Sequence, residues 1–351
     1  MQQNIRKILE IAIHAPSGEN CQPWKFKIKD NQIYLFNIPE RDQSPYNFKQ
    51  RGSFVAHGTL IENIIIASSF FGFETQVSLF PDISDTNLVA IISLNKSNPK
   101  EEPLFGYIVK RSTNRKSYKK TPLLPEDKQA ILDSVNEISR GKILITENKE
   151  DIKDLSLVGS MNERLVLENQ ALHDFLFSHI TWTEKENQEK KMGFYIKTLE
   201  LPLPARFAFK IFSKWERLKR FHKLGVSRSV WKQNGGVYAS SSAIGVIAID
   251  GNKNEDFVTV GRITQRMWLT ATKLGLSLQP MTGVLFFMQR IKEGNYEPFS
   301  KEQVDIIKES YVKVQKKFNL QNENIPMMFR IGYSSPPTAR AIKLSPEIIF
   351  D

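Results

Sequence analysis

The chain has 351 residues and a mass of 40.4 kDa, with 49 Lys and Arg against 38 Asp and Glu, giving a formal net charge of +11. Hydrophobic residues make up 40% and aromatic residues 11%, which excludes a disordered or collagen-like chain. The single cysteine, Cys21, excludes an intrachain disulfide, and no apolar run reaches the roughly 18 residues that a membrane span needs. The length predicts two domains or two intertwined halves. Because the first residues do not look like a signal peptide, we expect a soluble, cytoplasmic protein.

The positive charge is mostly scattered. Many lysines lie between acidic residues, as on solvated helix faces, and only 110–120 and 206–232 are locally basic. We therefore expect no nucleic-acid partner, and an anionic ligand that binds one of these two stretches is the alternative.

The first hundred residues predict a mixture of helices and strands. Apolar residues recur at helical spacing over 4–14, and two short alternating runs over 24–29 and 32–36 predict a hairpin. A strongly apolar helix over 57–71 follows, and then strands over 77–80 and 88–94.

Residues 96–103, KSNPKEEP, form a polar linker flanked by proline and are the predicted boundary between the two parts. The second part begins with a basic turn. Its further predicted elements are a helix after Pro125, a strand over 142–146, helices over about 150–232, a strand over 243–250, helices over 260–274 and 301–318, and a strand over 327–333.

Two segments, 58–72 and 261–275, look like copies of one helix. Each has a glycine at both ends, with the same separation, and small residues at matching places. The pattern alone leaves duplication and coincidence open, and the strands that follow each copy favour duplication. Two like halves can pack about a pseudo-two-fold axis, as a homodimer does.

The most specific local string is APSGENCQPWKF, over 15–26. It ends a helix and continues as a loop bent by Pro and Gly, with Ser17, Asn20 and Gln22 as neutral groups that donate and accept hydrogen bonds. Such groups suit the edge of a planar heteroaromatic ring. The alternative is an ordinary polar loop with a capping serine and a core tryptophan.

As a string, this loop resembles the flavin-dependent nitroreductase superfamily, which typically shows APS-x-x-N-x-QPW-x-F after a helix. The turn RSTNR over 111–115 resembles the basic R-x-S/T-x-R turn of that family. The glycine-bounded helix 261–275 and the ending FRIGYSSPPTARAIKLSPEIIF over 329–350 are also similar to family elements.

The order of these motifs is unusual, because the basic turn precedes the APS loop in the common short enzymes and follows it here. This order resembles the tandem branch of the superfamily, in which one chain holds two nitroreductase-like halves. The resemblance implies an α+β, nitroreductase-like fold whose two similar mixed halves form an intrachain pseudo-dimer. We expect the first half over 1–100 and the second over 101–351, with a helical insertion at about 150–232.

The resemblance also implies an FMN site built from both halves. In the basic turn, two guanidiniums four residues apart among hydroxyls can converge on one phosphate, although a solvated turn is the alternative. Loop 280–283 is expected to offer a backbone N–H near the flavin N5, and the tail adds positive charge. The expected cofactor-binding residues are Ser17, Asn20, Gln22, Arg111, Ser112, Thr113, Arg115, Pro280, Met281, Thr282, Gly283, Arg340 and Lys343.

No side chain is expected to act as a strict catalytic acid or base, because the flavin would carry the electron transfer. The five histidines share no metal-binding spacing, so we expect no metal site. Cys21 is expected to be a small buried residue.

Residues 205–224 predict a basic amphipathic helix. Seven basic residues and one acid surround an apolar face made of Phe207, Ile211, Phe212, Trp215, Leu218, Phe221 and Leu224. Such a helix covers its own protein's core in many cases and lies on an anionic membrane in others. The proline-stiffened segment before this helix favours a lid over the flavin. In that arrangement the apolar face of the helix packs against its own chain.

The expected function is FMN-dependent reduction of a quinone, nitroaromatic or similar small-molecule acceptor with electrons from NAD(P)H. One alternative is a flavin-binding storage or sensor protein with little turnover. Another is a maturation partner that dehydrogenates a peptide-derived azoline. A monomer holding the pseudo-dimer and a homodimer are both compatible with the sequence.

Overall fold

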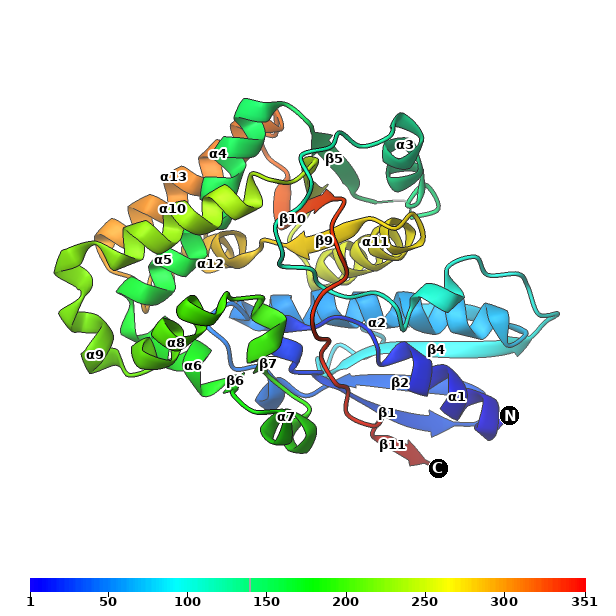
Figure 1. Ribbon diagram of the computed structural model, residues 1–351. Helices are drawn as coiled ribbons and strands as arrows, with labels where there is room; N and C mark the ends of the chain where they lie inside the picture. The colour runs from blue at the N-terminus through cyan, green and yellow to red at the C-terminus, as the bar shows by residue number, and fades with distance from the viewer. Residues whose placement is uncertain (139) are drawn as a thin grey trace.

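A computed structural model describes residues 1–138 and 140–351, and two long helices separate its two main sheets (Figure 1). The first repeat runs through α1 (Gln2–Ala12), β1 (Trp24–Lys29), β2 (Gln32–Asn37), α2 (Arg51–Phe70), β3 (Phe73–Leu79) and β4 (Leu88–Lys96). Its strands lie in the order β1-β2-β4-β3, and each neighbouring pair is antiparallel.

The second repeat has the same order of elements. It runs through α3 (Pro125–Asp133), β5 (Lys142–Thr146), β8 (Ala243–Ile249), α11 (Asn254–Lys273), β9 (Ser277–Pro280) and β10 (Asn324–Gly332). Its strands lie in the matching order β5-β8-β10-β9, again antiparallel throughout. The expected fold class, α+β with two similar mixed halves in one chain, is therefore confirmed.

The repeats meet where α2 crosses α11, at Gly58 and Gly261. A Cβ atom added to Gly58 would lie 1.9 Å from the Val258 carbonyl oxygen, and one added to Gly261 would lie 2.0 Å from that of Val55. In this reciprocal contact each glycine lies against the valine three residues before the other glycine, as expected about a pseudo-two-fold axis. Only glycine permits backbones to approach this closely.

A buried carboxylate reinforces the crossing. Glu62 of α2 is fully buried and pairs with Arg262 at 3.0 Å and Arg266 at 2.6 Å, both on α11. Beside it, the Gln265 amide donates to the Asn63 Oδ1 at 2.6 Å. A buried charge of this kind is tolerated because it is paired.

The C-terminal segment crosses from the second repeat to the first. In Figure 1 it runs down from the upper sheet, and its last strand, β11 (Ile348–Phe350), pairs parallel with β1. The predicted second half, 101–351, thus ends as an edge strand of the first sheet. The pairing covers the outer edge of β1, which would otherwise leave its backbone groups open.

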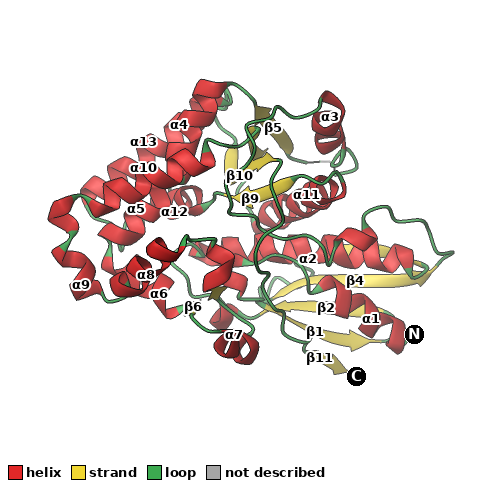
Figure 2. Cartoon of the chain, viewed as in Figure 1, coloured by secondary structure: helices red, strands yellow, loops and turns green. Residues whose placement is uncertain are grey.

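Helices fill the two insertions of the second repeat (Figure 2). Between β5 and β8 lie α4 (Lys149–Gly159), α5 (Met161–Glu168), α6 (Gln170–Ser178), α7 (Glu184–Lys190), α8 (Leu203–Phe212), α9 (Trp215–Arg220) and α10 (Val226–Tyr238), with the short strands β6 (Ile180–Thr181) and β7 (Phe194–Tyr195). Between β9 and β10 lie α12 (Gly283–Ile291) and α13 (Lys301–Lys317). Within the described ranges, the chain has no helix that is both long enough and apolar enough to cross a bilayer.

The single amphipathic helix predicted over 205–224 is wrong. The chain breaks at Lys214, whose φ of −101° and ψ of 113° are extended, so the segment forms α8, α9 and the short 3-10 helix 222–224. The break rotates the apolar residues away from a common face. Leu218 is fully buried, while Phe207 is 69% and Leu224 74% exposed, so the apolar face does not pack as a whole against its own chain.

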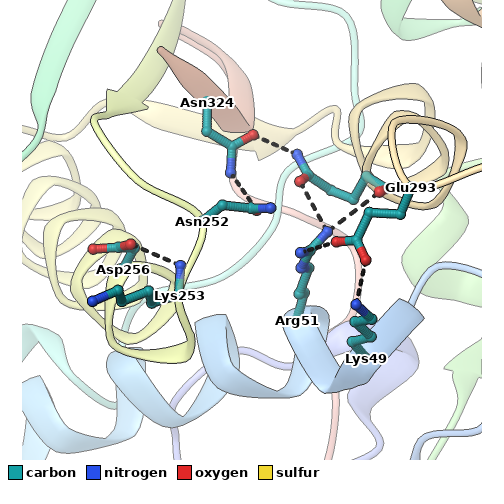
Figure 3. Close-up of polar contacts among 8 residues, drawn as sticks. Lys49, Arg51, Asn252, Lys253, Asp256, Glu293 and Asn324 are labelled. Atoms are coloured by element: carbon teal, nitrogen blue, oxygen red, sulfur yellow. Dashed lines mark hydrogen bonds and ion pairs between the residues drawn. The ribbon is translucent and has the colours of Figure 1, made fainter. Parts of the chain in front are cut away.

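The start of α2 depends on contacts from the second repeat (Figure 3). Arg51, only 4% exposed, pairs with Glu293, which also binds Lys49, and it donates to the Gln289 carbonyl oxygen at 3.3 Å. The Gln289 amide in turn donates to Asn324 at 2.6 Å. This network extends α2 to Arg51, six residues before the predicted start at 57. The observed start has no capping side chain that could have marked it in the sequence.

Candidate functional site

The APSGEN loop, 15–20, lies against the side of α2, which binds the start of the loop and the end of α1 before it. The Asn63 amide donates to the Ala12 carbonyl oxygen at 2.9 Å, and the Thr59 hydroxyl donates to that of Pro16 at 3.0 Å. The loop has positive φ at Glu19, Asn20 and Gln22, with values of 44°, 56° and 50°. Three such residues that are not glycine indicate backbone strain, which the surrounding contacts must stabilise.

The predicted ring-contact side chains are paired with protein groups. The Ser17 hydroxyl accepts from the Gln22 backbone N–H at 3.0 Å. The Asn20 amide donates to the carbonyl oxygens of Lys191, at 3.1 Å, and Ile342, at 2.9 Å. The Gln22 amide donates to the same Lys191 oxygen at 2.9 Å and accepts from the Leu344 N–H at 2.9 Å. The residue after α7 and the C-terminal tail therefore cover these amides.

Basic groups from three segments converge beside this loop. The Arg111 Nη2 donates to the His14 carbonyl oxygen at 3.0 Å, and its guanidinium lies 4.5 Å from the centre of the Trp268 ring. The Lys343 ammonium donates to the Ala15 carbonyl oxygen at 2.7 Å and to Asn20 Oδ1 at 2.8 Å. Arg340 donates to the Val109 carbonyl oxygen at 3.3 Å. We call His14, Arg111, Arg340 and Lys343 the cationic cluster.

The members of the cationic cluster disfavour one another's charge. Burial and then Arg111 lower the pKa of Lys343 to about 7. Burial and then Arg340 lower the pKa of Arg111 to about 9, and burial, Lys343 and Arg111 lower that of His14. Within the described part of the chain no carboxylate forms an ion pair with any of the four, and the buried Arg111 Nε has no partner. An anion placed here would satisfy both the charge and this donor.

The second arginine of the basic turn points elsewhere. Arg115 donates to the Thr198 carbonyl oxygen at 3.1 Å and lies 5.5 Å from the centre of the Phe194 ring. The expected convergence of Arg111 and Arg115 is thus replaced by that of Arg111 with the tail. Between them, Ser112 and Thr113 are half-buried, and Thr113 forms a parallel bridge with Leu278.

The predicted loop 280–283 joins β9 to α12. Pro280 pairs with Phe329 in the sheet, and the Met281 N–H donates to the Met328 carbonyl oxygen at 2.7 Å. Thr282 precedes α12 and gives it no side-chain cap. Gly283 begins the helix so close to α5 that an added Cβ would lie 2.3 Å from Asn162 Oδ1.

Sequence reasoning missed a buried polar group next to Arg115. Arg330 is fully buried, donates to Gln279 Oε1 at 2.8 Å and to the Lys116 carbonyl oxygen at 2.8 Å, and lies 3.9 Å from the centre of the Tyr118 ring. An arginine inside the apolar strand MMFRIGY was the available signal, because a buried charge needs dedicated partners.

Glu163 of α5 belongs to the same neighbourhood. It accepts from the Tyr238 hydroxyl at 2.5 Å through Oε1, while the buried Oε2 has no partner within the described chain. Burial raises the pKa of Glu163 to about 7, against the opposing influence of Arg115 and Arg330. No sequence pattern marks this residue.

Burial also shifts the pKa of the acidic residue in the APSGEN loop, Glu19. Burial and then the neighbouring Asp42 raise the pKa of Glu19 to about 8. Cys21 is buried, as expected for a small core residue, and its thiol lies 3.7 Å from Asp42 Oδ2. Of two surface hollows, one of about 330 Å³ is lined by Asp42 and Arg290, and the other, of about 370 Å³, by Glu168 and Arg228.

Comparison with known proteins gives distant relatives. No family model matches the chain. An uncharacterized protein of Mycobacterium tuberculosis is 22% identical over 334 residues, which are 94% of this chain and 46% of that protein. A putative NAD(P)H nitroreductase of the same species is 26% identical over 123 residues, which are 34% of this chain and 36% of that protein. The matched stretches cover less than half the length of each of these relatives.

Two solved structures are similar to this chain at low scores. A nitroreductase with bound FMN from Desulfitobacterium hafniense has a TM-score of 0.37 and 12% identity, covering 70% of this chain and 95% of its own. The FMN-dependent nitroreductase of Mycobacterium smegmatis, in complex with NADPH, has a TM-score of 0.36 and 10% identity, covering 66% and 88%.

The relatives named as putative NAD(P)H nitroreductases confirm, at the level of the superfamily, the resemblance to nitroreductases that the motifs predicted. The tandem branch stays a prediction.

Proposed function

We propose that this protein is an FMN-dependent oxidoreductase of the nitroreductase type, which reduces a quinone, a nitroaromatic or a similar small acceptor with electrons from NAD(P)H. The observation that carries the proposal is the cationic cluster. It joins the APSGEN loop, the basic turn and the C-terminal tail, the three segments that resemble family motifs, and it has no carboxylate partner in the described chain.

The residues present fit the phosphate of FMN. The unpartnered Arg111 Nε and the Lys343 ammonium supply donors and charge, and Ser112 follows directly in the chain. The fit at the ring edge requires rearrangement, because a ring that bonds Asn20 or Gln22 must displace the Lys191 carbonyl oxygen or the tail. Ser17, Thr113, Arg115 and loop 280–283 are further proposed contacts.

When bound, FMN would supply the hydride and electron transfer between NAD(P)H and the acceptor. The protein's part is to hold the cofactor and manage charge and protons nearby. Arg115 and Arg330 add positive potential around Glu163, whose carboxyl, with a pKa of about 7, can hold or release a proton at neutral pH.

A flavin-binding storage or sensor role is the second candidate. The observation that favours it is the cover over the APSGEN loop, in which Lys191 and the tail occupy the amides of Asn20 and Gln22. Steady consumption of NADH or NADPH with an added quinone or nitroaromatic supports the enzyme, and flavin binding without consumption supports the store. Localisation in the cytoplasm and a monomeric or dimeric state are also part of the proposal.

The test of cofactor binding is an absorbance spectrum of the purified protein, followed by FMN titration of variants. Arg111→Ala and Lys343→Ala are each expected to weaken FMN binding by about 1.5–3 kcal/mol, roughly 10- to 150-fold, the scale of a lost charge-assisted hydrogen bond. The exposed Lys120 lies in the same basic stretch, so Lys120→Ala is the matched control. Unchanged affinity in both cluster variants would contradict the proposed site.

A further inference from the structure

The positive charge of the chain is concentrated in one segment. Residues 202–228 hold eight basic residues and one acid, Glu216, and the rest of the chain holds 41 basic and 37 acidic residues. This segment therefore carries +7 of the net +11. It comprises α8, α9, the 3-10 helix 222–224 and the start of α10, and we call its exposed face the basic patch.

Large apolar side chains stand exposed in the basic patch. Leu203 is 77%, Phe207 69% and Leu224 74% exposed, and α8 has no buried residue. Leu203 and Phe207 are four residues apart, on one face of α8, and Lys210 continues that face along the helix. All the basic residues from Lys210 to Arg228 are exposed.

The basic patch is fixed to the protein by its inner side. The ring of His173 contacts the Phe212 carbonyl oxygen at 2.8 Å, and Phe209 packs on Phe177 with ring centres 4.6 Å apart. Leu218 of α9 is fully buried. In Figure 1, α9 lies at the outer edge of the helical cluster, away from both sheets. The exposed residues thus belong to a folded surface and not to a detached strap.

We propose that the basic patch binds an anionic lipid surface. Lysine and arginine attract anionic headgroups, each worth roughly a fivefold gain in binding, and exposed Leu and Phe enter the boundary between headgroups and acyl chains. Nucleic acid would use the charge and leave Leu203 and Leu224 without a role. A second copy of the chain would set +7 against +7 across a symmetric interface, which is unfavourable. The occupant that uses both features is a membrane surface, on which the protein lies without crossing it.

The experiment is sedimentation of the intact protein with vesicles. Binding is expected with vesicles of phosphatidylcholine and phosphatidylglycerol, not with phosphatidylcholine alone, and it should weaken as salt rises. Lys219→Gln with Arg220→Gln should lower binding about 25-fold. Leu203→Ser with Phe207→Ser, which keeps the charge, should lower it at least about tenfold, because both apolar contacts are lost. Lys96→Gln with Lys100→Gln removes the same charge from the exposed linker and should have little effect.

Circular dichroism checks that each variant is folded, and since the mutated side chains are exposed, none should lose its fold. Absence of binding to anionic vesicles would overturn the proposal. An equal loss of binding in the linker control would show that binding depends on net charge alone and would overturn the proposal. Full binding by the Leu203/Phe207 variant would show that the patch attracts any polyanion and would also overturn it. A dimer in solution that Phe207→Ser dissociates would assign the patch to a second copy instead. Each of these results is independent of flavin binding.

Discussion

Replacing Gly261 by Ala is expected to push the two repeats apart. The new Cβ would lie 2.0 Å from the Val55 carbonyl oxygen and 2.7 Å from Gly58 Cα, whereas a carbon and a carbonyl oxygen normally approach to about 3.3 Å. Both obstacles are backbone atoms, so no side-chain rotation relieves them and α2 must move about 1 Å from α11. Overpacking costs about 1–3 kcal/mol where side chains can adjust, so we expect at least about 3 kcal/mol here. Gly58→Ala should cost a similar amount, since its Cβ would lie 1.9 Å from the Val258 oxygen.

Urea unfolding of the single and double variants measures this effect. Gly236 is exposed in α10 with nothing within 4 Å of an added Cβ, so Gly236→Ala is the matched control. It should stabilise the protein by about 0.5–1 kcal/mol through helix propensity. The double variant at Gly58 and Gly261 should lose less than the sum of its parts, because one separation of the helices makes room for both methyl groups. Additive losses, or a Gly261→Ala protein as stable as the original, would refute the close crossing.

Three further predictions concern buried charges. Glu163→Gln should leave stability unchanged below about pH 4.5 and raise it by on the order of 3 kcal/mol above pH 7. Folding raises the pKa of Glu163, so between these two pH values the unfolded chain ionises first and the folded protein loses stability. Urea unfolding across pH measures this difference, and a difference that stays constant with pH would contradict the prediction. Arg51→Ala should cost about 1.5–3 kcal/mol, because the buried guanidinium loses its ion pair with Glu293 and its hydrogen bond to Gln289, whereas Lys49→Ala, at a side chain 60% exposed, should cost about 1 kcal/mol or less, and equal losses would argue against the network. Inorganic phosphate should bind with proton uptake near neutral pH, measured calorimetrically in two buffers, because an anion raises the lowered pKa of Lys343; Lys343→Ala should reduce the uptake and leave the share of His14, whose pKa is also lowered.

Local pattern determined most of the secondary structure. The strands at 24–29 and 142–146 were predicted with their observed bounds, and α13 within one residue, because alternation and helical spacing are properties of neighbouring residues. The sequence copies at 58–72 and 261–275 also predicted the pseudo-dimer, since the paired glycines that match in sequence meet in space.

Contacts between distant residues decided the rest. α2 begins at Arg51 because Glu293 and Gln289 bind that side chain, and neither lies within reach of a local pattern. The helix expected over 205–224 broke at Lys214, because Leu218 fills the core on one side of the break while Phe207 stays outside.

The candidate site shows the same division. The sequence identified Arg111 and Lys343 as basic residues in family-like motifs, and spacing alone paired Arg111 with Arg115. In the folded chain Arg111 reaches His14, 97 residues away, and Lys343 reaches Ala15, 328 residues away. Which charges share a site depends on where the loops and the C-terminal tail are packed, and that packing is a property of the whole chain and not of any segment.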